Sequence, residues 1–374
     1  MNISQENENT SFEEHCLDLN KDLGPFQFYT WGIGSNIIAI TGILLNIFAI
    51  AVLTQPRMRS STAVYLISLA VYDNVVLLSM IINFAIPTIN TNEAFNDTYS
   101  FMYSYLQPIA YPIALIAQTG TIYTTVGFTV ERYVAVCRPL QAANICTMNR
   151  SKKAVLCILL GSIMYNIPRM FEFETKTEWN SQYNHTRPTY STTELGKNKI
   201  YKEVYFIYLN LLVMFLMPFT LLTYLNTCLI NAIRTSRKSR MQMSSSAVKE
   251  NNMTIMLISV VVVFLVCQLP SIADNILWTV LKNNQQNCSA AYIKFTTISN
   301  LMVVFNSACN FVLYCLFGKK FRRVFSKLFC SRFRRSTVRY QFRPESTTLV
   351  SHIRDNTTKL YHIQGHHEME STSV

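Results

Sequence analysis

The chain has 374 residues, of which 50% are hydrophobic and only 14% are charged, and its mean hydropathy is +0.18. Soluble proteins average about 25% charged residues. The net charge of +12 does not indicate nucleic-acid binding, because the basic residues lie between hydrophobic runs and form no basic domain of their own. This composition excludes an ordinary soluble enzyme.

Long uncharged runs are the main feature of the sequence, and each exceeds the roughly 20 apolar residues that cross a bilayer as a helix. These runs are residues 23–56, 98–130, 204–233, 251–273 and 295–318. Together with two weaker segments they predict an all-α bundle of seven membrane spans, although hydropathy alone leaves six or eight open. The expected spans are 33–54, 63–87, 103–136, 154–169, 204–233, 251–281 and 291–317.

Lys and Arg residues concentrate in the loops after the first, third, fifth and seventh expected spans. The loop between the second and third spans instead has Glu93 and Asp97 and no basic residue. One loop, 169–203, departs from this alternation of charge, because it has six basic residues and five glutamates on the expected outer side. The positive-inside rule therefore predicts a plasma-membrane protein with its N-terminus outside and its C-terminus in the cytoplasm.

Glycosylation sequons agree with this orientation, since four of them fall on the expected outer side. They begin at Asn2, Asn9, Asn96 and Asn184. The expected organisation is an outer, glycosylated segment 1–32, a seven-span domain 33–317, a membrane-surface helix 318–330 and a cytoplasmic tail 331–374.

The third expected span ends in Glu131-Arg132-Tyr133, followed by "VAVCRPL". An arginine there could be a simple snorkelling anchor, but this does not explain the whole string. Further motifs occur in order: Asn46 in "GILLN", Asp73 in "LAVYD", Pro218, "FLVCQLP" at 264–270 and "NFVLY" at 310–314. Taken together, the chain resembles a rhodopsin-type G-protein-coupled receptor.

The resemblance implies a signalling receptor and not an enzyme, in which Arg132 faces the G protein when it is released. It places the switch at the inner end of the bundle, on Glu131, Arg132, Tyr133, Glu250, Asn310 and Tyr314. We expect Glu250 to pair with Arg132 at rest, with a solvated glutamate as the alternative.

Asp73 is a carboxylate near the middle of the membrane, where such residues are functional by default. By family position Asn46, Thr121, Asn306, Ser307 and Asn310 converge on it. Their oxygens suit a hard cation, so we expect a site able to hold Na⁺; the alternative is a hydrogen-bonded network without an ion. No other cofactor is required.

Several positions depart from the family pattern. Gln268 replaces a usual tryptophan, Phe311 a usual proline, and Asn226 a usual tyrosine. The usual disulfide between the third helix and the second outer loop is missing, because neither 99–107 nor 169–203 contains cysteine. The two cysteines expected outside, Cys16 and Cys288, either pair with each other or remain free thiols.

Two residues at family-specific positions exclude two classes of ligand, and a second resemblance indicates a third class. Ala114 stands where amine receptors carry an aspartate, and Val304 where opsins carry the retinal lysine. The strings "YPIALIAQTGTIYTTVGFTVERYVAVCRPL" and "YNIPRMFEFE" resemble invertebrate FMRFamide-type neuropeptide receptors, whose ligands end in Arg-Phe-amide. This implies an acid for the guanidinium and an aromatic cleft for the phenyl ring.

Three acids are candidates for the guanidinium: Asp274, Glu172 and Glu174, although the two glutamates could instead pair with Arg169 or Lys176. The expected cleft residues are Tyr111, Ala114, Gln118, Gln268 and Trp278. A lipid or small chemosensory ligand is the alternative for the same fold, and a transporter is disfavoured because inverted repeats and charged pore linings are not seen.

The C-terminal part predicts three further partners. Residues 317–330 read as an amphipathic helix on membrane lipid, with Cys330 a palmitoylation candidate. The Ser/Thr-rich stretch 336–358 suits receptor kinases and arrestin, and the end at Val374 suits a PDZ groove.

Overall fold

The structure, a computed structural model, describes residues 23–85, 93–180, 185–238, 245–280 and 289–330. Within them, seven helices are long and apolar enough to cross a membrane, which confirms the expected number of spans. They are Leu23–Leu53, Ser61–Asn83, Phe101–Cys137, Met148–Phe171, Tyr201–Thr235, Thr254–Leu277 and Ala290–Phe317.

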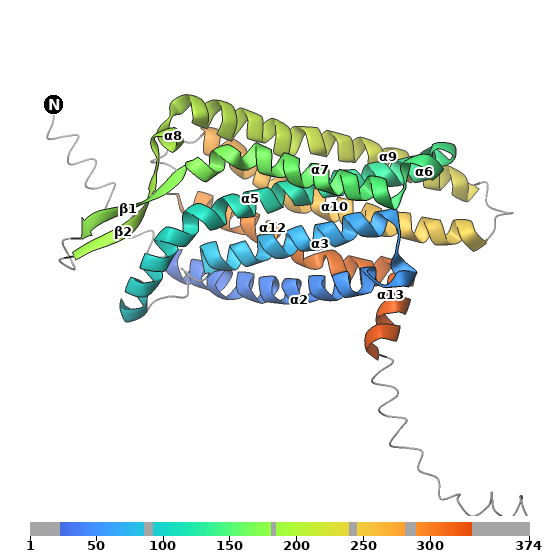
Figure 1. The fold of residues 1–374 in the computed structure, drawn as a ribbon, viewed down its shortest axis with the longest axis horizontal. Coiled ribbons are helices and arrows are strands. Elements are labelled where there is room, and N and C mark those ends of the chain that lie inside the picture. Colours follow the sequence, from blue (N-terminus) through green and yellow to red (C-terminus); the bar gives the residue numbers. More distant parts are fainter. Residues whose placement is uncertain (1–22, 86–92, 181–184, 239–244, 281–288, 331–374) are drawn as a thin grey trace, which may run out of the picture. The chain divides into compact units, whose positions relative to one another are not determined.

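The spans are built on seven long α-helices, which Figure 1 labels. These are α2 (Ser35–Leu53), α3 (Ser61–Met80), α5 (Glu93–Cys137), α7 (Met148–Asn166), α9 (Met217–Lys238), α10 (Ser245–Val280) and α12 (Ala290–Phe317). Wider π-helical turns extend three of them, at Phe28–Gly34 before α2, Ile81–Ala85 after α3, and Tyr201–Leu209 with Leu211–Leu216 before α9.

Shorter elements connect the long helices. They are the 3₁₀ turns Pro56–Met58 and Ile167–Phe171, the helices α6 (Pro139–Ile145), α8 (Glu194–Lys197) and α13 (Lys319–Phe325), the π-helical turn Ser326–Cys330, and the strands β1 (Phe173–Asn180) and β2 (His185–Thr192). The short helix α13 follows the last span, as expected.

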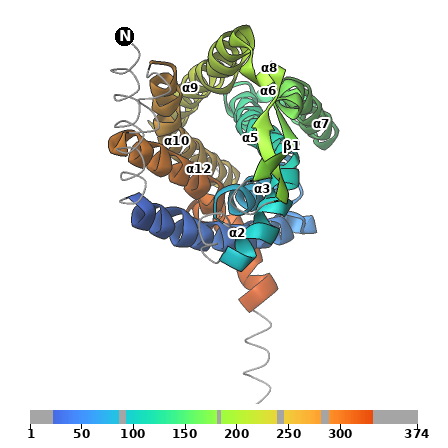
Figure 2. The same cartoon turned by 90° about the vertical axis from the view of Figure 1, so that its left-hand side faces the viewer.

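Two compact units make up the chain, Met1–Arg322 and Arg323–Val374. In the first, α3 packs against α2, α5 and α7, while α12 packs against α2, α3 and α10. Figure 2, which looks along the helices, shows them arranged around one another. In the second unit, the described residues 323–330 bring the rings of Phe325 and Phe329 to 5.1 Å.

Side-chain caps set where several helices begin. The Ser60 hydroxyl accepts the Ala63 N–H at 3.1 Å, which fixes the start of α3. Thr147 and Ser289 do the same for α7 and α12. Each such cap stabilises a helix by about 1 kcal/mol.

The described part of the first span already includes Leu23, ten residues before the expected start at Ile33. Gly24, Pro25, Gly32 and Gly34 argue against a helix there on propensity alone. Burial of Trp31 and Gly32 within the fold overrides that preference, and the segment continues directly into α2.

The bundle has a buried apolar core, but it also exposes large apolar side chains and buries polar ones. Large apolar side chains such as Ile37, Leu44 and Val266 are exposed, as lipid-facing positions require, whereas Asn46 and Asp73 are fully buried. Small residues allow the helices to approach closely: a Cβ added at Gly42 would lie 2.6 Å from that of Ala308 in α12.

An antiparallel hairpin, which hydropathy did not predict, follows the fourth span. Its register pairs Phe173 with Thr192 at the open end and Asn180 with His185 at the other. Both strands pack against α5, and Figure 1 shows the hairpin at the end of the bundle opposite α6.

Candidate functional site

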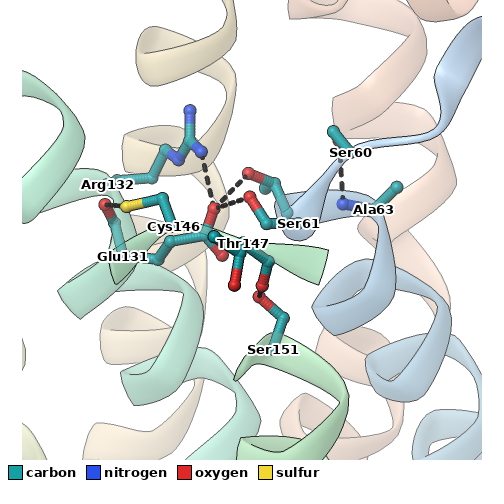
Figure 3. Close-up of polar contacts among 9 residues, drawn as sticks. Ser60, Ser61, Ala63, Glu131, Arg132, Cys146, Thr147 and Ser151 are labelled. Carbon is teal, nitrogen blue, oxygen red and sulfur yellow. Dashed lines mark hydrogen bonds and ion pairs between the residues drawn. The ribbon is translucent and has the colours of Figure 1, made fainter. Parts of the chain in front are cut away.

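The Glu131 carboxylate is the centre of a polar cluster at the α6 end of the bundle (Figure 3). Its Oε1 accepts hydrogen bonds from Ser61 at 2.5 Å, Thr62 at 3.1 Å and the Arg132 guanidinium at 2.8 Å. Glu131 and Arg132 are only 5% and 8% exposed. The structure therefore holds Arg132 in a buried ion pair with its own neighbour.

The expected partner of Arg132, Glu250, lies within α10, but its side chain is outside what the structure describes. The Glu250–Arg132 pair stays a prediction. The Arg132 Nε is buried and has no hydrogen-bond partner among the described residues, so one donor of the guanidinium is left for a further acceptor. Tyr133, the third residue of the motif, is half-buried.

Four residues near this switch were missed by sequence reasoning. Ser61 and Thr62 lie 70 and 69 positions before Glu131, and no local spacing reveals such pairs. The Cys146 thiol lies 3.6 Å from the Glu131 carbonyl oxygen; burial, followed by the Glu131 charge, raises the pKa of this thiol. Leu140, which lies in the string "VAVCRPL" but was given no role of its own, is 94% exposed in α6.

Asp73 is fully buried and is held by the residues that family position indicated. Thr121 donates to its Oδ1 at 3.3 Å and Asn310 to its Oδ2 at 2.7 Å, and Ser307 also contacts it. Asn46 donates to the Ser307 carbonyl at 3.0 Å. The structure thus brings this predicted set together, except that no hydrogen bond joins the buried Asn306 side chain to Asp73 in the described residues.

The donor set of this network fits a cation. The Asn46 Oδ1 is buried without a hydrogen-bond partner among the described residues. A carboxylate and an unpaired amide oxygen are the ligands that a hard cation prefers. Asp73 and the Asn46 Oδ1, with Thr121, Ser307 and Asn310, would hold Na⁺ there, and the ion would neutralise the carboxylate; its binding stays a prediction.

The departures from the family pattern are buried at the positions that sequence reasoning named. Tyr314, which belongs to the expected switch set and is not a departure, is 1% exposed, and its ring centroid lies 5.5 Å from that of Phe321. Phe311 also meets Phe321, at 5.7 Å. Gln268 and Asn226 are buried, and in the described part of the chain the side-chain carbonyl of each lacks a partner.

At the hairpin end, Glu172 forms a buried ion pair with Arg169 at 2.9 Å, with the side chains 9% and 6% exposed. The Tyr201 hydroxyl donates to the same carboxylate at 3.4 Å, and the Arg169 guanidinium lies over the Tyr205 ring at 5.4 Å. Glu174 pairs with Lys176 at 2.8 Å on the exposed surface. Both glutamates therefore follow the alternative interpretation, and neither is free for a ligand.

Tyr111 of α5 belongs to a series of aromatic rings shared with the hairpin. Its centroid lies 5.7 Å from that of Phe173, edge to face, and Phe173 stacks on Tyr190 at 4.6 Å. Burial, followed by Tyr111, Tyr103 and Glu172, raises the pKa of the Tyr190 phenol, which is therefore neutral at physiological pH. These rings form an apolar wall of the kind expected for an aromatic ligand group.

Asp274 in α10 is half-buried and accepts a hydrogen bond from Thr296 of α12 at 2.6 Å. Among the described residues it takes part in no ion pair. Ala114 and Gln118 are half-buried in α5. Trp278 lies in α10, but its side chain is outside the description.

Other expected sites lie outside the described residues. These are Cys16 and Cys288 of the predicted disulfide and the sequons at Asn2, Asn9 and Asn184. Asn96 lies in α5 and Cys330 in the last helical turn, without a description of either side chain.

A bundle of seven candidate membrane spans with a buried arginine–glutamate pair at one end is the architecture of a multi-pass membrane protein. Residues 45–314 match the family of 7 transmembrane receptors (rhodopsin family). The chain belongs to this family, whose members are signalling receptors and not enzymes.

Among its relatives, the chain is similar to the FMRFamide receptor of Drosophila melanogaster, at 34% identity over 85% of this chain and 57% of the relative. It is 32% identical to an FMRFamide peptide receptor of Caenorhabditis elegans, over 77% of this chain and 66% of the relative. The sex peptide receptor of Drosophila melanogaster is 24% identical over 81% of this chain and 73% of the relative. The chain thus spans less than two thirds of the length of the two FMRFamide receptors.

Proposed function

We propose that this chain is a plasma-membrane receptor for a peptide ending in Arg-Phe-amide, and that it passes the binding event to a heterotrimeric G protein. The observation that carries the proposal is the Asp274 carboxylate, which contacts the neutral hydroxyl groups of Thr296 and Tyr292 and forms no ion pair among the described residues. A guanidinium would satisfy it with charge-assisted hydrogen bonds.

The ion pairs of the other two candidate acids support the assignment of Asp274 to the ligand guanidinium. Glu172 is neutralised by Arg169 and Glu174 by Lys176, so Asp274 is the acid of the three that is left for the ligand. The rings of Tyr111, Phe173 and Tyr190 suit the phenylalanine ring. The names of the two FMRFamide relatives point to the same ligand class.

On the inner side, Leu140 supports docking of a G protein. It stands 94% exposed on α6, a helix that packs against α5, which carries Arg132. Its exposed side chain is accessible for contact with a docking partner. Receptor kinases, arrestin and a PDZ protein, whose sites lie in 331–374, stay predictions, as does the outward orientation of the N-terminus.

The proposal is tested with amidated and free-acid forms of one Arg-Phe peptide on cells expressing the chain and a promiscuous G protein. We expect a response to the amidated form, reduced at least 10-fold in potency by Asp274→Asn. The Asp274→Arg receptor should not respond to the Arg-Phe peptide. It should respond better to a peptide in which glutamate replaces that arginine. Glu174→Gln is the matched control and should leave potency unchanged. Equal potency on Asp274→Asn and on the original chain would rule out the assignment of Asp274.

A further inference from the structure

The outer hairpin docks on α5 although the sequence provides no cysteine for a cross-link in 99–107 or 169–203. One residue of α5 contacts both strands. The Ser104 hydroxyl donates to the Pro188 carbonyl of β2 at 2.9 Å, and the Thr175 hydroxyl of β1 donates to the Ser104 carbonyl at 2.5 Å. Ser104 is 5% exposed, so these bonds are shielded from solvent.

The same faces of the helix and the hairpin carry the aromatic wall. Tyr111 lies seven residues after Ser104, two turns along the same side of α5. Phe173 lies two residues before Thr175, on the same side of β1. The hydrogen bonds at Ser104 and the contact between Phe173 and Tyr111 therefore belong to one docking face.

We propose that Ser104 is a positioning residue that anchors the hairpin in place of a covalent cross-link, and that it thereby sets Phe173 and Tyr190 against Tyr111. The role of that wall in peptide binding rests on the proposed function; the anchoring itself does not. Hydrogen bonds of this kind form and break reversibly, so the hairpin is held without a disulfide and its docking is insensitive to reductant.

A first test needs no ligand and uses hydrogen exchange of the full chain in lipid nanodiscs. Ser104→Ala and Thr175→Val should each speed exchange of the β1 and β2 amides several-fold, and the double variant should speed it further. Thr189→Val is the matched control, because the Thr189 hydroxyl donates an exposed hydrogen bond of 3.3 Å to the Lys176 carbonyl of the other strand, and among the described residues it makes no hydrogen bond to α5. Unchanged exchange in the first two variants, or the same increase in all three, would overturn the anchor.

A second test replaces the hydrogen bonds with a covalent bond. In a Cys16→Ser, Cys288→Ser background, Ser104→Cys with Thr175→Cys should form a disulfide on oxidation and return exchange to the rate of the unmodified hairpin. Reductant should then speed exchange in this variant and leave the original chain unchanged. Failure of the two cysteines to cross-link, or fast exchange despite cross-linking, contradicts the proposed contact.

The peptide readout separates the two proposals. With an amidated Arg-Phe peptide as the probe, Ser104→Ala should lower potency several-fold and the oxidised cysteine pair should restore it. Intact potency in Ser104→Ala, with faster exchange, would remove the positioning role. If no such peptide activates the original chain, the proposed function fails, while the exchange and cross-linking results still decide whether Ser104 anchors the hairpin.

Discussion

Glu131 is a buried carboxylate in the set of residues that the family resemblance assigns to the switch. It receives three donors, and a hydrogen bond to a charged group contributes about 1.5–3 kcal/mol. The Arg132 guanidinium is thereby kept within the bundle, while its Nε lacks a partner among the described residues. Weakening the donors on α3 should therefore shift the equilibrium toward a released arginine.

We expect Ser61→Ala to raise ligand-independent nucleotide exchange on the G protein several-fold, because Glu131 loses a donor. Ser60→Ala is the control: it removes the α3 cap, costs about 1 kcal/mol of stability, and should leave basal exchange unchanged. Equal basal exchange in both variants would mean that Ser61 does not hold the switch.

The Asp73 network makes a prediction about ions. If Na⁺ occupies it, the ion stabilises the folded receptor by mass action. The melting temperature of the purified receptor should then be higher in sodium than in potassium at equal ionic strength, and Asp73→Asn should abolish the difference. Identical melting temperatures for the unmodified chain in both salts would leave a hydrogen-bonded network without an ion.

At the scale of elements, the end of the fourth span depends on the Arg169–Glu172 pair. Both side chains are buried, and removing one partner of such a pair typically costs about 3–5 kcal/mol. Glu172→Gln should therefore lower the melting temperature markedly. The exposed Glu174–Lys176 pair is the matched comparison, and Glu174→Gln should cost less than about 1 kcal/mol. Similar losses in both variants would contradict the buried role of Glu172.

The elements also show which features the sequence could predict. Hydropathy predicts the spans because lipid requires long apolar helices. It missed that the first span already includes Leu23, where glycine and proline mask a helix stabilised by packing. The hairpin was missed because its strands are polar and lack the alternation of apolar and polar residues that indicates a strand.

The candidate site also has residues that the sequence could predict and residues that it could not. Motif positions correctly gathered Asp73, Thr121 and Asn310, because these residues recur in the resembled family. The partners Ser61 and Thr62 of Glu131 depend on packing between α3 and α5, which no spacing along the chain encodes. Spacing also could not decide whether Glu172 pairs with Arg169 or with Lys176.

At the scale of the whole molecule, the seven candidate spans of the described residues predict that the two ends of the chain lie on opposite sides of the membrane. The excess of Lys and Arg in alternate loops predicts that the N-terminal side faces outward. An antibody against an N-terminal tag should bind intact cells, whereas one against a C-terminal tag should require permeabilisation. Binding of both tags on intact cells would contradict an odd number of spans.

The central claim is that a peptide bound on the outer side changes the state of Arg132 on the inner side. Its most direct measurement is nucleotide exchange on a purified G protein by the full chain in nanodiscs, with and without an amidated Arg-Phe peptide. The account predicts that the peptide accelerates exchange with the original chain and not with Arg132→Ala, while both bind the peptide. Peptide binding without acceleration in the original chain, or equal acceleration in Arg132→Ala, would contradict it.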